Sequence, residues 1–369
     1  MNLLAAATLC TSIWALPPAD RQAALSEAAG LASAPTVVYA TGAGAERPLS
    51  AAIGFADPAM GRQLTADTPL RVASNTKTFV AATLLRLQEQ GAIDLDTAIG
   101  SLIDPEFVTI LKGDGYDPSR ITVRQLMSHS GGLYDHGGDA RYVTAMLSTP
   151  RRKWKRIDQL RLMTEYADPQ SEPGTRFLYS DTGYILLGNI IERKTGKSLA
   201  AAVREALRFD DLGLKSTWWE NAEVRPASAE PPARQHIDGR DVSSVHASFD
   251  LYGGGGLMMS ARDLATLFAA LFEDRIFEKR ATLREMLAVA GHEGSNRYRL
   301  GVFAEQTPEG EVYWHSGFWG TAVYYDPRKK LAVAAYTTRQ ERFRPETLPL
   351  LQSMIGIRPA VCAQPKLPE

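Results

Sequence analysis

A serine and a lysine three residues apart could form a nucleophilic pair at the start of a helix. The stretch Arg71–Val80 contains Ser74 and Lys77, and apolar residues then recur at a spacing near 3.6 until Gly91. Positions i and i+3 share a helix face, so the two side chains should point the same way. In the first turn, backbone N–H groups around Ser74 lack intrahelical partners and can hold an oxyanion. Lys77 could then take or stabilise the serine proton.

The same two residues also permit a structural interpretation. Ser74 could be a helix N-cap and Lys77 a solvated helix lysine, because Ser-x-x-Lys is common by chance. The rest of the chain must decide between the two interpretations.

Two further segments place reactive side chains where an expected element begins or ends. Tyr179 lies on a loop before the apolar helix expected over Ile185–Ile191, although it could equally be a core tyrosine. His315–Gly317 stand at the end of the strand expected over Glu311–His315. Both segments are therefore candidates for the same site as Ser74.

His129 follows a short helix that we expect Thr122 to cap, and Gly131 and Gly132 end it. It could act as a base, but nothing beside it in the sequence forms a triad. We therefore interpret it as a structural histidine that forms hydrogen bonds near the serine helix. We interpret Lys194–Gly196 as a helix C-terminus with a capping glycine. A phosphate-binding loop would need a glycine five residues before Gly196 and a strand that leads into the loop, and the sequence has neither.

Composition excludes several classes of function. The chain has 369 residues, 44% of them hydrophobic, which suffices for one large domain or two lobes. Its net charge of −1 argues against a nucleic-acid partner, which would require a basic stripe. No Gly-x-Ser-x-Gly or His-Glu-x-x-His motif occurs, which argues against an α/β-hydrolase and a metallohydrolase.

The N-terminus has the pattern of an export signal. Leu3–Ala15 is apolar and ends in small residues, although no Lys or Arg precedes it, so residues 1–15 could be a cleaved signal peptide or an ordinary helix of a cytoplasmic protein. We favour export to the periplasm or secretion. Cys10 and Cys362 fit neither a zinc site nor a disulfide framework, and no later stretch has the length of a transmembrane helix.

Periodicity and turn residues place the remaining elements. They predict helices over Ala19–Ala29, 157–168, Ala261–Phe272 with Ser260 as its cap, and Pro345–Ile355. Strands are expected over Thr36–Thr41, Leu49–Phe55, Tyr298–Ala304, Thr321–Tyr325 and Leu331–Thr337, with turn-rich connections over 92–110 and a surface segment over 220–245.

Three motifs now stand in order: Ser74–Lys77, Tyr179–Asp181 and His315–Gly317. Together they resemble the Ser-x-x-Lys, Tyr-x-Asn and Lys-Thr-Gly or His-x-Gly motifs of the penicillin-recognising serine hydrolases. The resemblance runs from about residue 35 to about residue 340. It is nearest to the branch that holds class C β-lactamases, D-alanyl-D-alanine carboxypeptidases, D-aminopeptidases and related esterases.

The resemblance implies a role for each motif. Ser74 would be the nucleophile, and Lys77 and Tyr179 would share the general-base work and return the proton to the leaving group. The backbone N–H groups of Ser74 and Phe318 would form the oxyanion hole. Substrate would bind against Asp181, His315, Ser316 and Gly317. The reaction would cleave an ester, an amide or a D-amino-acid peptide bond through an acyl-enzyme.

The resemblance also implies the architecture. We expect an α+β, β-lactamase/transpeptidase-like fold, with an antiparallel sheet flanked by helices, a mainly helical lobe, and the site in the cleft between them. Residues 16–95 and 251–358 would form the α/β lobe, and 96–250 the helical lobe. No metal or other cofactor is implied, the partner would be a small-molecule or peptide substrate, and the oligomeric state stays open.

Two residues depart from the family pattern. Asp181 stands where the family usually has Asn, and a carboxylate beside Lys77 would favour the charged lysine. His315 replaces the Lys of typical β-lactamases, and a neutral histidine would hold a substrate carboxylate less firmly. An ionised Asp181 cannot donate a hydrogen bond to a substrate carbonyl as an amide can, which argues against β-lactamase activity. His315 favours an esterase or aminopeptidase over a penicillin or D-alanyl-D-alanine site. The alternative is a catalytically silent binding or sensor protein on the same scaffold.

Overall fold

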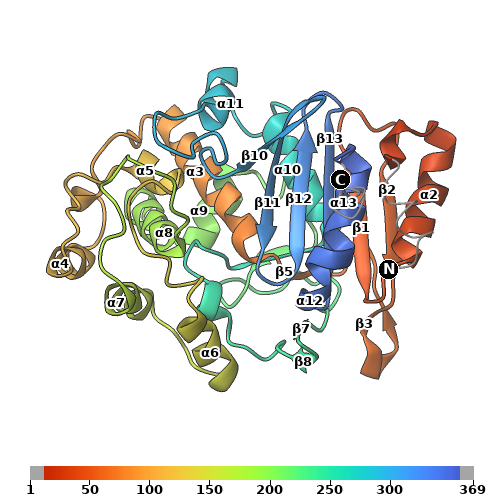
Figure 1. The fold of residues 1–369 in the computed structure, drawn as a ribbon, viewed down its shortest axis with the longest axis horizontal. Coiled ribbons are helices and arrows are strands. Elements are labelled where there is room, and N and C mark those ends of the chain that lie inside the picture. Colours follow the sequence, from red (N-terminus) through yellow and green to blue (C-terminus); the bar gives the residue numbers. More distant parts are fainter. Residues whose placement is uncertain (1–11, 358–369) are drawn as a thin grey trace, which may run out of the picture.

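The computed structural model describes residues 12–357 (Figure 1). Most of the expected signal segment, Cys10 and Cys362 lie outside these residues. Ile13 and Trp14 are buried against the C-terminal helix and the sheet. Signal-peptide cleavage after Ala15 therefore stays a prediction, and it would remove two core side chains.

A six-stranded antiparallel sheet forms one half of the molecule, with the order β10-β11-β12-β13-β1-β2 (Figure 1). The two ends of the chain build it together, because β1 pairs with β13 from Thr36↔Thr337 to Thr41↔Ala332. The strands are β1 (Thr36–Thr41), β2 (Leu49–Ile53), β10 (Phe303–Thr307), β11 (Gly310–Gly317), β12 (Thr321–Asp326) and β13 (Leu331–Thr337).

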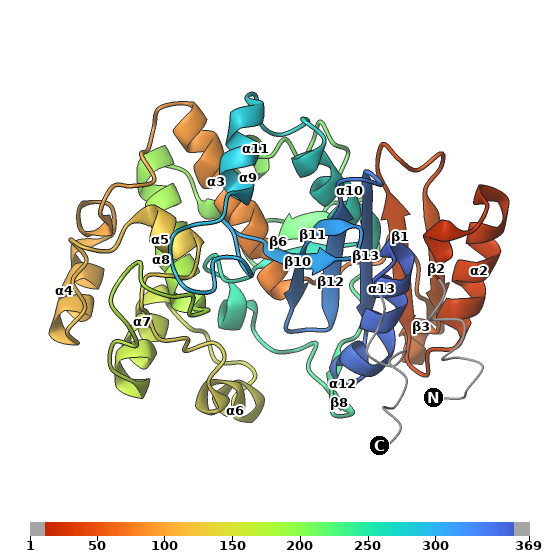
Figure 2. The same cartoon turned by 45° about the horizontal axis from the view of Figure 1, so that its top comes forward.

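Both faces of the central strands β1, β12 and β13 are buried. In β13, Leu331, Val333 and Ala335 point to one face, and Ala332 and Ala334 point to the other, as the two-residue period of a strand requires. Helices α2 (Pro18–Gly30) and α13 (Leu348–Ile355) cover the first face, and α10 (Ala261–Phe272) covers the second (Figure 2). These central strands therefore lie between two apolar layers, whereas the edge strands β2 and β10 are partly exposed.

The residues between strands β2 and β10 form mainly helices. It contains α4 (Pro105–Gly113), α5 (Val123–Met127), α6 (Ala140–Ser148), α7 (Arg156–Tyr166), α8 (Asp181–Thr195) and α9 (Leu199–Ala206). A small sheet, β5-β9-β6, lies beside them, formed by β5 (Leu70–Arg71), β9 (Leu257–Met259) and β6 (Thr217–Trp219). The other short elements are β3 (Phe55–Asp57), β4 (Arg62–Gln63), β7 (His236–Ile237), β8 (Arg240–Asp241), α11 (Arg280–Leu287) and α12 (Gln340–Arg342).

Helix α3 (Thr76–Glu89) lies in the interior. Every residue from Thr76 to Leu87 is buried, and the helix contacts α8, α9 and α11. A helix that is buried all round belongs to the core, so α3 provides a rigid base for the residues that precede it.

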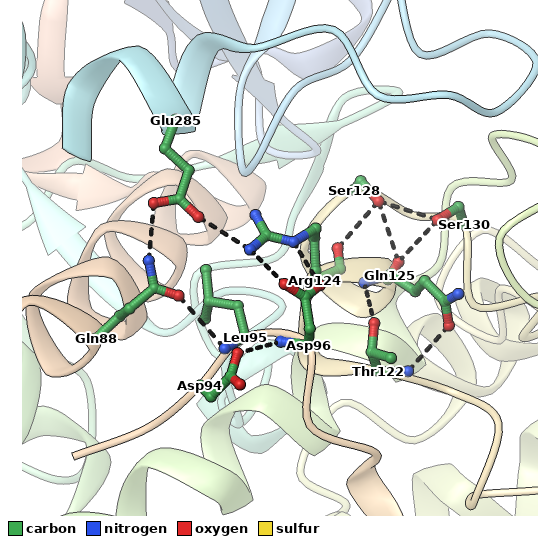
Figure 3. Close-up of polar contacts among 10 residues, drawn as sticks. All are labelled: Gln88, Asp94, Leu95, Asp96, Thr122, Arg124, Gln125, Ser128, Ser130 and Glu285. Atoms are coloured by element: carbon green, nitrogen blue, oxygen red, sulfur yellow. Dashed lines mark hydrogen bonds and ion pairs between the residues drawn. The ribbon is translucent and has the colours of Figure 1, made fainter. Parts of the chain in front are cut away.

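A polar network holds α5 in place beside α3 (Figure 3). Arg124 of α5 pairs with Asp96 at 2.7 Å and with Glu285 of α11 at 2.9 Å. Gln88 of α3 donates to the same Glu285 carboxylate at 2.8 Å. Thr122 caps α5, as the sequence predicted, and the structure shows that Gln125 completes a capping box. The network fixes the turn that follows α5, which carries His129.

Several sequence predictions are confirmed to the residue, namely β1, β13, and α10 with its Ser260 cap. Others are wrong in part. The strand expected over Tyr298–Ala304 begins only at Phe303, and Ser74 precedes α3 in a 3₁₀ turn (Ala73–Asn75). Helix α8 begins at Asp181, four residues before the expected start, because Ser180 caps it. Within residues 12–357, no helix combines the length and apolar character needed to cross a bilayer.

Candidate active site

Ser74 and Lys77 meet as the sequence predicted. Lys77 Nζ lies 2.9 Å from Ser74 Oγ and 2.6 Å from the Gly254 carbonyl oxygen. Ala73 directly precedes the serine with φ at 45°, a conformation that is costly for a residue with a side chain. This turn lets Lys77, one helical turn later, lie completely buried beside the serine hydroxyl. The solvated-lysine interpretation is thereby excluded.

Asp181 is the nearest group that favours the charged state of Lys77. Its Oδ1 atom lies 2.5 Å from Lys77 Nζ. Burial, the largest single influence, lowers the pKa of Lys77, but the negative charge of Asp181 acts together with those of Tyr179 and Asp250, and the net pKa is raised. Lys77 is therefore a cation near neutral pH, as the sequence predicted from the Asp at this position.

Tyr179 lies next to the same ammonium group, with Lys77 Nζ 5.1 Å from the centroid of its ring. Burial raises the pKa of Tyr179 well above its usual value, and the Lys77 charge and hydrogen bonding to Ser74 act in the opposite direction. Tyr179 lines the cavity that contains Ser74, which places it at the site.

His129 fixes the backbone on both sides of Tyr179. Its Nδ1 atom accepts a hydrogen bond from Ser180 N–H at 3.1 Å, and its carbonyl oxygen accepts one from Leu178 N–H at 2.7 Å. Its ring stacks on Tyr179 with the centroids 4.1 Å apart. Burial lowers the pKa of His129 well below its usual range, so the ring is neutral. This agrees with the structural role we inferred from the sequence.

The backbone N–H groups of Ser74 and Phe318 are available for an oxyanion. Neither donates a hydrogen bond to another atom among residues 12–357. Gly317 brings the two together, because a Cβ atom at this position would overlap the Val72 carbonyl oxygen and the Thr321 hydroxyl. Asn75 Nδ2 donates to both of these oxygens, at 2.7 and 2.8 Å, which ties the serine turn to β12.

Replacement of Gly317 by Ala should therefore displace the end of β11 from the serine turn. Misplacing one oxyanion donor costs about 10²- to 10³-fold in kcat. We expect a loss of that order in the hydrolysis of any accepted ester, measured by steady-state kinetics. Gly30→Ala is the matched control, since nothing lies within 4 Å of a Cβ atom at Gly30. Equal activity of the two variants would contradict this role for Gly317.

His315 is an uncharged side chain that lines the cavity containing Ser74. Its Nδ1 atom lies 2.9 Å from the Ser316 carbonyl oxygen, so Nδ1 carries the proton and Nε2 accepts from Tyr298 Oη at 3.1 Å. Burial lowers the pKa of His315 to about 3. Strand β10 pairs with β11 only as far as Trp314, so among residues 12–357 one edge of His315–Gly317 has no neighbouring strand. Their substrate-binding role stays a prediction.

The candidate site is a cavity of about 420 Å³. Ser74, Tyr179, Asp181, His315–Gly317 and Phe318 all line it, so the structure brings the predicted residues together. The sequence did not identify Asp135 and Asp250, which line the same cavity. No motif marks them, and only the fold brings their loops to the serine. Within residues 12–357, no three His, Cys, Asp or Glu side chains converge to bind a metal ion.

Replacement of Asp181 by Asn should change the pH dependence of catalysis. The Asp181 charge raises the pKa of both Lys77 and Tyr179, so its removal lowers both. A base derived from either group then forms at lower pH, and the ascending limb of log kcat/KM against pH should move at least about one unit toward acid. An unchanged limb, or one displaced toward alkali, would show that Asp181 does not set this titration.

The chain matches a family model described as Beta-lactamase over residues 23–352. Penicillin-binding protein 4* of Bacillus subtilis (strain 168) is 25% identical over 297 residues, which are 75% of this chain and 63% of that protein. Esterase EstB of Burkholderia gladioli is 34% identical over 175 residues, 46% of this chain and 43% of that protein. This chain thus spans less than two thirds of the length of either relative.

Solved structures share the fold. A D-stereospecific amidohydrolase from Streptomyces sp. superposes with a TM-score of 0.75 at 24% identity, covering 92% of this chain and 98% of the other. D-amino acid amidase from Ochrobactrum anthropi SV3, complexed with D-phenylalanine, gives 0.70 at 24% identity, covering 86% and 90%. The expected β-lactamase/transpeptidase-like fold is confirmed, and the family model covers most of the sequence. The chain belongs to the Beta-lactamase family.

Proposed function

We propose that this chain is a serine hydrolase that cleaves an ester or amide bond through an acyl-enzyme on Ser74. The observation that carries the proposal is the 2.9 Å contact between buried Lys77 Nζ and Ser74 Oγ, because Ser74 lines a cavity together with Tyr179. A serine hydroxyl is a weak nucleophile, and an adjacent group that manages its proton activates it.

The charges of the site suggest how the proton moves. Lys77 stays cationic because of Asp181, so it stabilises negative charge on Tyr179 and on the Ser74 oxygen. The phenolate form of Tyr179, which burial disfavours and which grows as the pH rises, takes the serine proton as Ser74 attacks the carbonyl carbon. The C–O or C–N bond to the leaving group breaks when Tyr179 returns that proton. The N–H groups of Ser74 and Phe318 hold the carbonyl oxygen as it becomes negative. Water then releases the acyl group by the same steps.

The neutral state of His315 affects which class of substrate the site can bind. His315 is neutral and both ring nitrogens are engaged inside the protein, so it supplies no cation for a substrate carboxylate. This favours esters and amides over penicillins or peptides that end in a free carboxylate, and makes carboxypeptidase action the less favoured form. The relatives named as esterase EstB and D-amino acid amidase support the same substrate classes.

We also propose that the protein is exported, because Leu3–Ala15 has the pattern of a signal peptide. A relative named teichoic acid D-alanine hydrolase, from Staphylococcus aureus, supports action on a cell-wall polymer. The N-terminal sequence of the protein recovered from cells and from the medium would test this point.

A pair of esters with one acyl group and two leaving groups tests the reaction type. p-Nitrophenyl isobutyrate and phenyl isobutyrate should form one acyl-enzyme, so added methanol should yield methyl isobutyrate in the same proportion from both. Different proportions would exclude a common acyl-enzyme. A lack of hydrolysis of these esters and of the corresponding anilides would favour the silent scaffold.

A further inference from the structure

A dense run of basic residues connects α6 to the start of α7 (Figure 1). Residues 151–156 read Arg-Arg-Lys-Trp-Lys-Arg, and no other six-residue stretch of the chain contains as many Lys and Arg. We refer to residues 151–155 as the basic loop. Its four cations are all exposed, namely Arg151, Arg152, Lys153 and Lys155. Since the whole chain has a net charge of −1, the basic loop is a local excess of positive charge on a nearly neutral protein.

The four exposed cations have no carboxylate partner. None of them forms an ion pair within residues 12–357. Two carboxylates beside the loop are engaged otherwise, because Glu192 pairs with Arg156 at 2.7 Å and Asp158 accepts a hydrogen bond from the Lys155 N–H at 2.9 Å. The charges of the loop are therefore available to an anion from outside the chain.

The backbone of the basic loop is held in place, although it has no regular secondary structure. His246 N–H donates to the Pro150 carbonyl oxygen at 2.7 Å, and Trp154 N–H donates to Ser248 Oγ at 2.8 Å. The Tyr252 hydroxyl donates to the Trp154 carbonyl oxygen at 2.7 Å. An anion that binds the loop thus loses little free energy to the ordering of the backbone.

The anchor of the loop lies beside the candidate active site. Trp154 is buried and packs edge-on against Tyr142, with the ring centroids 4.9 Å apart. Tyr142 in turn stacks on Phe249, with the centroids 4.7 Å apart. Tyr142 and Phe249 both line the cavity that contains Ser74. A layer of aromatic side chains therefore separates the basic loop from this cavity.

The residue types of the loop discriminate among anionic partners. Segments that bind membranes place exposed apolar residues in the bilayer, and proteins that bind single-stranded nucleic acids stack bases on exposed aromatic rings. The only apolar side chain of the loop is Trp154, which is buried. Arg binds a phosphate group through two hydrogen bonds, and Lys binds it as a point charge. The loop therefore matches a chain of phosphate groups without bases and without a bilayer.

We infer that the basic loop binds a linear, phosphate-bearing polymer and holds it beside the cavity of Ser74. This inference goes beyond the proposed function, because the loop residues do not touch the reacting atoms and binding needs no hydrolysis. Several phosphate groups on one chain can contact the four cations at once. After the first contact the others form within one complex, so a polymer binds more tightly than separate phosphate ions.

Calorimetric titration with long-chain sodium polyphosphate at several salt concentrations tests the inference. For a flexible polyanion, the logarithm of the binding constant falls by about 0.7 per phosphate contact for each decade of salt, so four cations predict a slope of about −3. The triple variant Arg151→Gln/Lys153→Gln/Lys155→Gln should bind at least about tenfold more weakly, with a slope of about −1. Arg152 is kept because its guanidinium lies over the Trp154 ring, 3.6 Å from the centroid.

A second triple variant, Lys112→Gln/Lys194→Gln/Lys215→Gln, is the matched control. It removes the same charge from three exposed lysines in separate parts of the chain. It should bind polyphosphate within about twofold of wild type, because salt screens distant surface charges. Equal weakening in the two triple variants would reduce the effect to net charge and overturn the site. Binding of wild type to phosphatidylglycerol vesicles but not to polyphosphate would overturn the polymer in favour of a membrane.

Ester hydrolysis separates this inference from the proposed function. The basic-loop variant keeps Ser74, Lys77 and the cavity, so it should hydrolyse p-nitrophenyl isobutyrate at the wild-type rate. Absence of polyphosphate binding by wild type at low salt, or a salt slope near zero, would overturn the inference without any variant and leave the serine hydrolase intact. Absence of ester hydrolysis in wild type that still binds polyphosphate would overturn the proposed function alone.

Discussion

Ser74→Ala should lower kcat for ester hydrolysis by about a million-fold, the order of loss seen when a serine nucleophile is removed from its catalytic group. The variant keeps the oxyanion N–H groups and the cavity, so it should still bind substrate. Residual activity should therefore stay above the uncatalysed rate. Steady-state kinetics with p-nitrophenyl isobutyrate measure the effect.

Ser26→Ala is the matched control for this substitution. Ser26 is an exposed serine of α2, on the far side of the sheet from the site (Figure 1). It should retain full activity. A Ser74→Ala protein with a loss of only a few-fold would mean that another group attacks the carbonyl.

Lys77→Met should lower kcat by about 10⁴-fold, the upper end for loss of a general acid–base group. Methionine fills a similar volume but removes the contacts to Ser74 Oγ, the Gly254 carbonyl oxygen and Asp181. The Lys77 charge also lowers the pKa of Tyr179, so its loss makes the tyrosine a poorer base at neutral pH. Lys112→Met, an exposed substitution in α4, is the control for the substitution itself.

The same variant should lose stability in a pH-dependent way. Lys77 lowers the pKa of Asp135 and of Asp250, so both pKa values rise above about 7 when Lys77 is removed. A carboxyl group whose pKa is raised in the folded state costs no stability below its unfolded pKa, and costs progressively more as the pH rises toward the folded value. The Tm difference from wild type should therefore be larger at about pH 8 than at about pH 5 in calorimetry. A constant difference would contradict this charge balance.

The sequence was sufficient to predict a helix or strand where its own residues include a cap or a regular apolar pattern. Helix α10 was predicted to the residue because Ser260 caps it and its apolar residues keep the helical period. Strand β13 was predicted because Leu331–Thr337 is almost entirely apolar and follows the turn at Asp326–Arg328. Helices α4 and α6 were missed, because Pro105 and Asp139 start them inside segments that are rich in turn residues.

Only those residues of the candidate site that lie in recognisable motifs could be predicted from the sequence. Ser74, Lys77 and Tyr179 stand in recognisable patterns, and the structure places Ser74 and Tyr179 in one cavity with Lys77 buried beside them. Asp135 and Asp250 have no pattern, because their loops reach the serine only when the helical segment packs on the sheet. The fold, and not a sequence motif, therefore brings these carboxylates together in the cavity.

Reaction with an alkyl fluorophosphonate tests the central claim, that Ser74 is the activated nucleophile, most directly. A nucleophilic serine displaces the fluoride and keeps the phosphonyl group, so intact mass and peptide mapping can locate it. We expect one phosphonyl group per chain, on the peptide that contains Ser74, with much slower labelling in Lys77→Met and none in Ser74→Ala. Labelling of a different residue, or equal labelling of Ser74→Ala, would contradict the account.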